Sequence, residues 1–117
     1  MAFRFESLDI WKASGGYGSA LYDVAQSFPK HETFAMGDQL RRAALSISNN
    51  IAEGSGSASN KDFINFLNIA IKSTFETVSI LYMAKKRGYI TLAQRQQLYG
   101  QAEVLVKKIQ SFKKTLK

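Results

Sequence analysis

The sequence predicts an all-α protein: one domain over residues 1–117, built as an antiparallel up-and-down bundle of four helices. Three observations support this prediction. Apolar residues recur every three or four positions in four segments, which is the spacing of one helical face. Proline, glycine and serine interrupt the pattern between those segments. The connections are short, so neighbouring helices are expected to fold back along one another.

The first predicted helix spans residues 7–28. Ser7 is a suitable N-cap residue, and Pro29 prevents the helix from continuing. Glycines at positions 15, 16 and 18 interrupt the segment, and each costs about 1 kcal/mol relative to alanine in a helix interior. The core-facing stripe is expected to contain Ile10, Ser14, Tyr17, Leu21, Val24 and Phe28.

The second predicted helix spans residues 37–53, and Gly54 is expected to adopt the left-handed conformation that often follows a helix. The apolar stripe contains Leu40, Ala44, Ile47 and Ile51. A polar stripe on the opposite side cannot point into the same core. Together with a neighbouring asparagine it forms what we call the polar face: Arg42, Ser46, Asn49, Asn50 and Glu53.

The polar face is unusual because serine and asparagine are mediocre helix formers in the middle of a helix. Stability alone would not select them. We expect these residues to form hydrogen bonds across a subunit interface. A hydrated surface is the next alternative, and a ligand site is the third.

The third predicted helix spans residues 60–87, from a capping box at Ser59 and Asp62 to Gly88. It is apolar nearly all round. We name its three apolar stripes core, second and third: Phe63, Leu67, Ala70, Thr74, Thr77, Leu81 and Ala84; Ile64, Ile71, Phe75, Val78 and Tyr82; and Phe66, Ile69, Ile80 and Met83. Three other helices cannot cover all three, so we expect self-association. Ordinary scattered apolar exposure is the alternative.

The fourth predicted helix spans residues 92–115. It opens with a capping box formed by Thr91 and Gln94. Its apolar residues keep the bundle spacing to the end of the chain, so this side is expected to pack into the core. They are Leu98, Ala102, Leu105, Ile109, Phe112 and Leu116.

The formal net charge of +7 is concentrated in one part of the sequence. Residues 1–84 contain seven Lys and Arg against eight Asp and Glu, whereas residues 85–117 contain nine against Glu103 alone. We expect the nine to gather at one end of the bundle and to bind RNA or DNA through phosphates. They are Lys85, Lys86, Arg87, Arg95, Lys107, Lys108, Lys113, Lys114 and Lys117.

Two tyrosines in the same region, Tyr89 and Tyr99, are candidates to stack on unpaired bases, although tyrosines in bundles also pack at core edges. The alternative function is a protein-binding scaffold without direct nucleic-acid contact. In that case the lysines would keep the protein soluble and would guide its association with the partner protein.

The sequence argues against an enzyme, a metal site and a cofactor. Cysteine is absent, and His31 is the only histidine and lies in a predicted loop without a nucleophile pattern. No Glu-x-x-His pair is present, and the glycine- and serine-rich segment 54–61 lacks the Gly-Lys-Ser/Thr of a phosphate-binding loop. No signal peptide or membrane-spanning run is recognisable, so we expect a cytoplasmic protein without membrane contact.

An ordered set of segments extends through most of the chain: Leu8–Trp11, Phe28-Pro29, Glu32, Phe34, Gln39–Ala44, Ser46-Ile47, Asn50–Gly54, Phe63–Ala70 and Gly88–Ile90. Together they resemble the four-helix bundle family of bacterial proteins encoded within 23S rRNA intervening sequences. The resemblance implies a left-handed bundle that forms a homo-oligomeric ring, with a pentamer as the expected state. It implies no enzymatic activity.

A related branch resembles the accessory variability determinant of diversity-generating retroelements. This relationship implies nucleic acid and a reverse transcriptase as partners. The chain departs from the family at three glycines of the first helix, Gly15, Gly16 and Gly18, and at Lys72 and Phe75 in the third. The details of the ring interface are therefore expected to differ.

Overall fold

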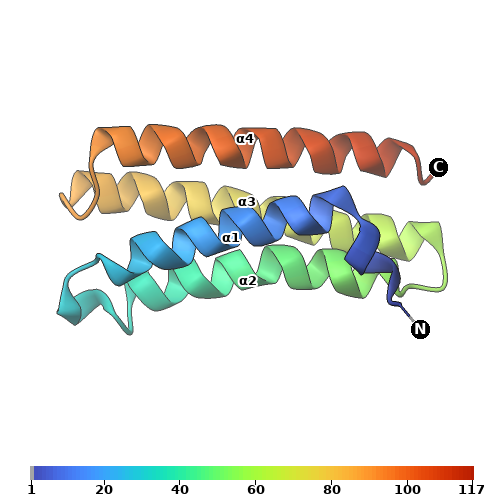
Figure 1. Cartoon of the computed structure of the whole chain (residues 1–117), viewed down its shortest axis with the longest axis horizontal. Coiled ribbons are helices and arrows are strands. Elements are labelled where there is room, and N and C mark those ends of the chain that lie inside the picture. Colours follow the sequence, from blue (N-terminus) through green and yellow to red (C-terminus); the bar gives the residue numbers. More distant parts are fainter. Residues whose placement is uncertain (1) are drawn as a thin grey trace.

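The structure is a computed structural model that describes residues 2–117. In that range it contains four α-helices and no β-strand: α1 (Asp9–Gln26), α2 (Met36–Ser55), α3 (Asn60–Lys86) and α4 (Leu92–Lys114). Two short 3-10 helices, η1 (Arg4–Ser7) and η2 (Lys30–Glu32), precede α1 and α2. Each α-helix turns back along the one before it, and the two ends of the chain lie at the same end of the molecule (Figure 1). The all-α prediction is confirmed.

Helix α1 is shorter at both ends than its predicted range. It begins at Asp9 because residues 4–7 form η1, in which the Ser7 hydroxyl donates to the Arg4 carbonyl at 3.1 Å instead of capping α1. It ends at Gln26, and the Phe28 amide bonds the Ala25 carbonyl in a tighter turn. Phe28 is nevertheless buried. Ala25 is buried where the sequence predicted Val24, which is half-buried.

The expected left-handed conformation of Gly54 is wrong. Helix α2 continues through this glycine to Ser55, and within residues 2–117 Gly88 alone has a positive φ, of 78°. Gly54 is required for a different reason. A Cβ atom there would lie 2.7 Å from Cδ1 of Phe63 and 2.8 Å from Cβ of Phe66. The missing side chain therefore lets α2 approach α3 closely.

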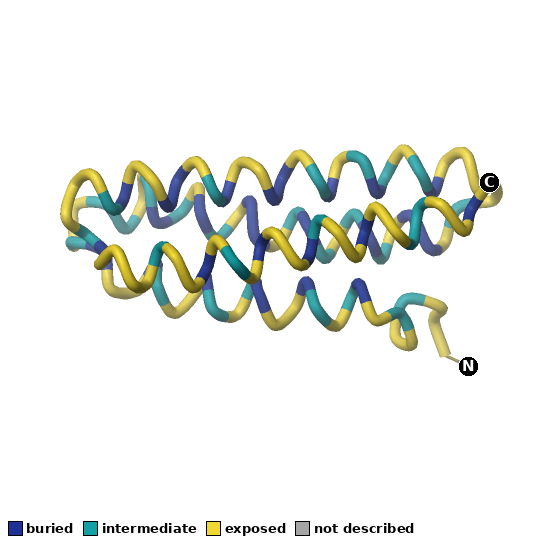
Figure 2. Tube along the Cα trace, turned by 90° about the horizontal axis from the view of Figure 1, so that it is seen from above, coloured by how far each residue is buried: buried dark blue, intermediate teal, exposed yellow. Residues whose placement is uncertain are grey.

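The three apolar stripes of α3 face three different surroundings. The core stripe is completely buried, and the buried segments of all four helices face inward (Figure 2). The third stripe faces α2, where Phe66 lies beside Gly54. The second faces α4, where Tyr82 contacts Tyr99 with ring centroids 6.4 Å apart. Helices α2 and α4 thus cover part of the second and third stripes, for which cover by self-association was expected from the sequence.

Both outer stripes remain partly exposed. On the third stripe, Ile69 is 44% exposed and Met83 is 48% exposed; on the second, Phe75 is 65% exposed and Tyr82 is 45% exposed. These values exceed those of core side chains by a wide margin. Helix α3 therefore leaves two apolar edges open to solvent in the single chain.

A small polar layer lies inside the core between α1 and α3. The hydroxyls of Tyr17 and Thr77 are 2.8 Å apart, and the Thr77 hydroxyl donates to the Thr74 carbonyl at 2.6 Å. Because threonine has one hydroxyl proton, Tyr17 must donate to Thr77. Burial raises the pKa of Tyr17 to about 12, so the phenol stays neutral in the folded state.

Replacing Gly54 with alanine should destabilise the protein by about 1–3 kcal/mol, because the new methyl group would overlap Phe63 and Phe66. Gly15→Ala is the matched control. No atom lies within 4 Å of a Cβ at that helical position, so alanine should stabilise the protein by about 0.4–1 kcal/mol. Urea unfolding of both variants measures the two free energies. A Gly54→Ala protein as stable as the Gly15→Ala protein would contradict the close approach of the helices.

Removing the Tyr17 hydroxyl in Tyr17→Phe should cost about 1 kcal/mol at pH 9, because one buried hydrogen bond is lost. The folded-state pKa lies above the ordinary value of 10, so the Tyr17 contribution is present below pH 10 and is lost as pH rises toward 12. The stability difference should therefore move against the wild type over that interval by up to about 2–3 kcal/mol, so that Tyr17→Phe becomes the more stable protein at pH 12. Urea unfolding of both proteins at pH 9, 10.5 and 12 tests this. A difference that stays constant with pH would contradict it.

Candidate nucleic-acid interface

The nine predicted basic residues form two groups rather than one cluster. The turn group lies at the end of α3 and the start of α4 and contains Lys85, Lys86, Arg87 and Arg95. The C-terminal group lies on the second half of α4 and beyond it, and contains Lys107, Lys108, Lys113, Lys114 and Lys117. The expectation that all nine gather at one end is wrong. Helix α4 extends along the bundle, and a rise of 1.5 Å per residue separates Arg95 from Lys113 by about 27 Å.

The turn group is fixed by two helix caps. At the end of α3, the amide of Gly88 bonds the Lys85 carbonyl at 3.0 Å and the amide of Tyr89 bonds the Ala84 carbonyl at 2.9 Å, which together make a Schellman motif. At the start of α4, Thr91 and Gln94 form the predicted capping box, with bonds of 3.1 and 2.8 Å. The short connection holds the cations of both helices together.

Arg95 is held against aromatic rings of the turn. Its guanidinium carbon lies 4.2 Å from the Tyr82 ring centroid, which is the geometry of a cation–π contact. Its Nε atom is buried and has no hydrogen-bond partner within residues 2–117. The rings of Tyr82 and Tyr99 meet edge to face and are 45% and 43% exposed. Arg95 is therefore preorganised beside two partly exposed tyrosines, one of which it covers on one face.

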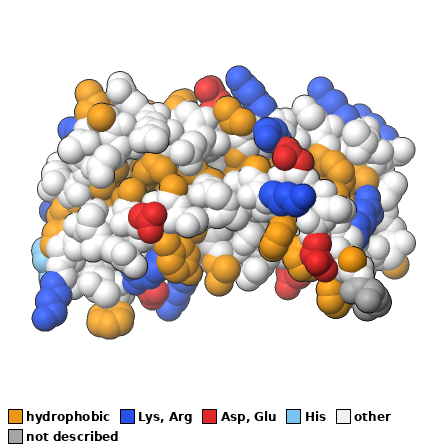
Figure 3. All heavy atoms as spheres, in the orientation of Figure 1, with side chains coloured by type: hydrophobic (Ala, Val, Ile, Leu, Met, Phe, Trp, Pro, Cys, Tyr) orange, Lys and Arg blue, Asp and Glu red, His pale blue; other side chains and the backbone are white. Residues whose placement is uncertain are grey.

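The C-terminal group is mostly without acidic partners. Lys108 forms an ion pair with Asp9 at 3.1 Å, and Lys113 donates to Oδ1 of Asn68 at 2.6 Å. Among the nine cations, Lys108 alone forms an ion pair with any of residues 2–117. Lys and Arg side chains are visible along the α4 edge in Figure 3, toward the C-terminal end of that helix.

A groove between α3 and α4 lies between the two groups. Its volume is about 300 Å³. The floor is largely apolar, with Phe75, Val78 and Tyr99 among its lining residues, and Glu103 and Lys107 also line it. Tyr99 therefore belongs both to this groove and to the aromatic contact with Tyr82. Stacking at Tyr99 was a prediction from the sequence, whereas Phe75 and Tyr82 had been assigned only to an apolar stripe.

The structure divides the polar face of α2. Ser46 and Asn50 turn toward α3: the Ser46 and Ser73 hydroxyls are 2.8 Å apart, and Nδ2 of Asn50 donates to the Ser46 carbonyl at 2.7 Å. Arg42, Asn49 and Glu53 are exposed. The five residues therefore do not converge on one point, and the bonds of Ser46 and Asn50 lie within the chain.

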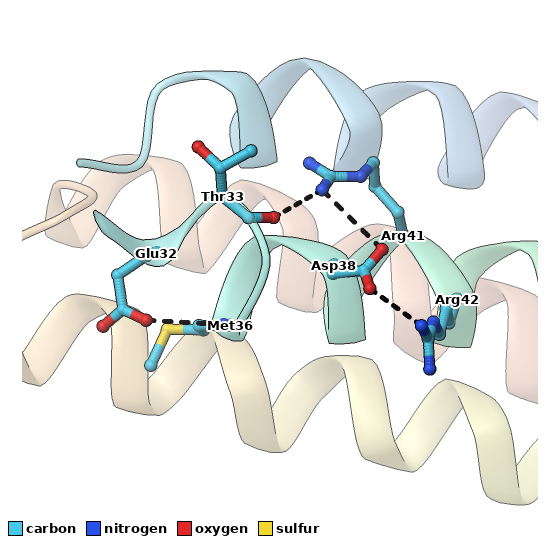
Figure 4. Close-up of polar contacts among 6 residues, drawn as sticks. All are labelled: Glu32, Thr33, Met36, Asp38, Arg41 and Arg42. Atoms are coloured by element: carbon cyan, nitrogen blue, oxygen red, sulfur yellow. Dashed lines mark hydrogen bonds and ion pairs between the residues drawn. The ribbon is translucent and has the colours of Figure 1, made fainter. Parts of the chain in front are cut away.

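Asp38 is the partner of two arginines at the start of α2 and was missed in the sequence. Its carboxylate lies 3.0 Å from Arg42 and 3.8 Å from Arg41, and Arg41 also donates to the Thr33 carbonyl at 2.7 Å (Figure 4). The spacing of three and four residues was the available signal. Arg42 already has a carboxylate partner, which makes it a poorer phosphate ligand than the cations of α4.

Tyr89 has a structural role that the sequence did not predict. Its hydroxyl donates to Oε2 of Glu32 at 2.8 Å, and its ring packs on Phe28 with centroids 5.7 Å apart. This hydrogen bond lowers the pKa of Glu32 and raises the pKa of Tyr89. His31 lies in the exposed connection between α1 and α2, with Nε2 3.4 Å from the Tyr89 hydroxyl. Because Tyr89 ties this connection to the α3–α4 turn, the expectation that it stacks on bases is not supported.

Neither a metal centre nor a membrane span is found in the described part of the chain. Residues 2–117 contain no group of three or more His, Cys, Asp or Glu side chains arranged to hold a metal ion. The helices of this region are too short or too polar to cross a bilayer.

Comparisons with known proteins give a family and similar solved structures. Residues 6–111 match the family described as 23S rRNA-intervening sequence protein. The structure is similar to the crystal structure of a protein with unknown function from the S23 ribosomal protein family of Bacteroides thetaiotaomicron. The two chains are 28% identical, with a TM-score of 0.82 over 90% of this chain and 98% of that chain. No curated protein matches the chain.

Proposed function

The chain belongs to the 23S rRNA-intervening sequence protein family, and from this premise we propose that it is a non-catalytic, nucleic-acid-binding bundle. In this proposal the antiparallel, left-handed bundle forms a homo-oligomeric ring, with a pentamer as the expected state. RNA or DNA binds through the turn group and the C-terminal group. Family membership confirms the resemblance seen in the sequence; the binding role is our inference from the charges.

The observation that carries the proposal is the shortage of acidic partners around α4. Lys108 alone among the nine cations is paired with a carboxylate of residues 2–117. Clustered cations without counter-charges repel one another and attract polyanions. A phosphate backbone would supply the missing negative charge and release its own counterions, which is the main source of non-specific nucleic-acid affinity. Binding through phosphates carries little sequence specificity.

The α2–α3 side of the bundle supports the proposed assembly. Ile69 and Met83 are 44% and 48% exposed and share that side with Arg42, Asn49 and Glu53. Apolar side chains bordered by polar ones are typical of a protein–protein contact. A second copy of the chain would cover this edge and leave α4 open to nucleic acid.

The same edge favours the second candidate function, a scaffold for a different protein such as a reverse transcriptase. In that case Ile69 and Met83 would bind the partner and the cations would only steer it. The two functions differ in salt dependence. Phosphate binding weakens steeply with salt, whereas burial of apolar surface does not.

A salt series with a charge-matched control tests the proposal. Lys114→Gln/Lys117→Gln removes two cations from the C-terminal group, and Lys12→Gln/Lys30→Gln removes two exposed cations outside α3 and α4. Both variants carry the same net charge. Fluorescence polarisation with 20-mer RNA should give a log–log salt slope that is shallower by roughly 1.5 in the first variant only, because each lost phosphate contact removes about 0.7–0.9.

Two results would contradict the proposal. Equal loss in both variants would indicate a general effect of net charge. Absence of binding to single-stranded and duplex RNA at low salt would exclude a nucleic-acid role and leave the scaffold as the remaining candidate.

A further inference from the structure

We propose that the surface between α3 and α4 binds single-stranded nucleic acid, with unpaired bases stacked on aromatic rings between the two cation groups. This inference rests on the proposed function and specifies its ligand. We call this surface the aromatic seam and define it by Phe75, Tyr82, Arg95 and Tyr99. The seam explains why two cation groups, separated along α4, belong to one binding surface.

On one face of α3, two aromatic rings lie between two lysines. Lys72, Phe75, Tyr82 and Lys86 follow one another at intervals of three, seven and four residues. These intervals place the four side chains on one face of a helix. Lys72, Phe75 and Tyr82 are exposed, and so is Lys86. The seam therefore has a cation beyond each end of its aromatic part, where phosphates of a bound strand can be contacted.

Helix α4 repeats this arrangement. Arg95 lies against Tyr82 at one end, Tyr99 follows one turn later, and Lys107 lines the groove at the other end. The positive groups of the seam and its ends are Lys72, Lys86, Arg95 and Lys107, and the nearby negative group is Glu103. The surplus is positive, and a carboxylate at the groove can accept hydrogen bonds from the amino groups of unpaired bases.

All three rings of the seam are exposed, and two of them, Tyr82 and Tyr99, are held in place by contacts within the chain. Phe75 is 65% exposed, more than any ring of the core, while Tyr82 is fixed by Arg95 on its face and by Tyr99 at its edge. A ring that is already ordered loses little entropy when a base stacks on it. Stacking on exposed aromatic side chains is the common means by which proteins hold unpaired bases.

Charge favours this ligand over a second copy of the chain. Two seams face to face would bring four cations of each copy together with only Glu103 to offset them. Duplex RNA is also a poorer ligand, because its bases are stacked inside and cannot reach the rings. A duplex would therefore bind through the cations alone, without contact to the rings.

The test compares a single-stranded 12-mer RNA with a blunt-ended duplex RNA of the same length under equal salt. Phe75→Ala/Tyr99→Ala should weaken single-strand binding at least tenfold, because two rings that stack on bases are lost. Duplex binding and the salt slope should not change, because no cation is removed. Phe34→Ala is the matched control. It removes a ring that is 90% exposed in the connection between α1 and α2, and it should bind both RNAs as the wild type does.

A second variant distinguishes loss of the binding surface from loss of the fold. Phe75→Ala alone removes a ring that packs little, so circular dichroism should show that the fold is retained, and single-strand binding should fall about fivefold.

If single-strand binding by the double variant equals that of the wild type, the seam proposal is wrong and the proposed function stands. Equal loss for both RNAs would also overturn it. If light scattering shows that Phe75→Ala dissociates an oligomer, the seam is a subunit contact instead. If the wild type binds neither RNA, the proposed function itself fails.

Discussion

Helix α3 must bury apolar side chains on three sides, and the positions of its neighbours follow from how each side is packed. The core stripe is completely enclosed. On the α2 side the residues at the contact are small: Gly54 leaves room for Phe63 and Phe66, and the hydroxyls of Ser46 and Ser73 meet at 2.8 Å. Small side chains let the two helices approach closely at these points, while Ile69 and Met83 on the same side remain 44% and 48% exposed.

The α4 side is packed with large rings, and this difference creates the candidate site. Phe75 and Tyr99 line a groove of about 300 Å³ between α3 and α4, and Tyr82 packs against Tyr99. Tyr82 and Tyr99 are ordered by their contact with each other, and Tyr82 also by its contact with Arg95. The cations on either side of this opening have few carboxylates to neutralise them. The packing of α3 against α4 thus accounts for the apolar part of the surface, and the Lys and Arg residues of positions 85–117 supply its charged part.

The sequence could predict features that depend on residues close together in the chain. The helical stripes, the Thr91 capping box and the role of Gly88 as the residue after α3 were all recognisable. Features that depend on residues far apart in the sequence could not be predicted. Gly54 looked like a helix end because the aromatic rings it accommodates come from another helix. Tyr89 looked free to stack because Glu32 lies far away in the sequence. The nine cations looked like one cluster because sequence proximity does not show that α4 extends along the bundle.

The central claim is that nucleic acid contacts the aromatic side of α3 and α4. The most direct measurement is photo-cross-linking of the wild-type protein to a single-stranded RNA that carries 4-thiouridine, followed by mass spectrometry of the cross-linked peptides. We predict cross-links at Phe75, Tyr82 or Tyr99. Cross-links confined to Tyr22 in α1 and Phe34 in the connection after it, two exposed rings outside α3 and α4, would contradict the account.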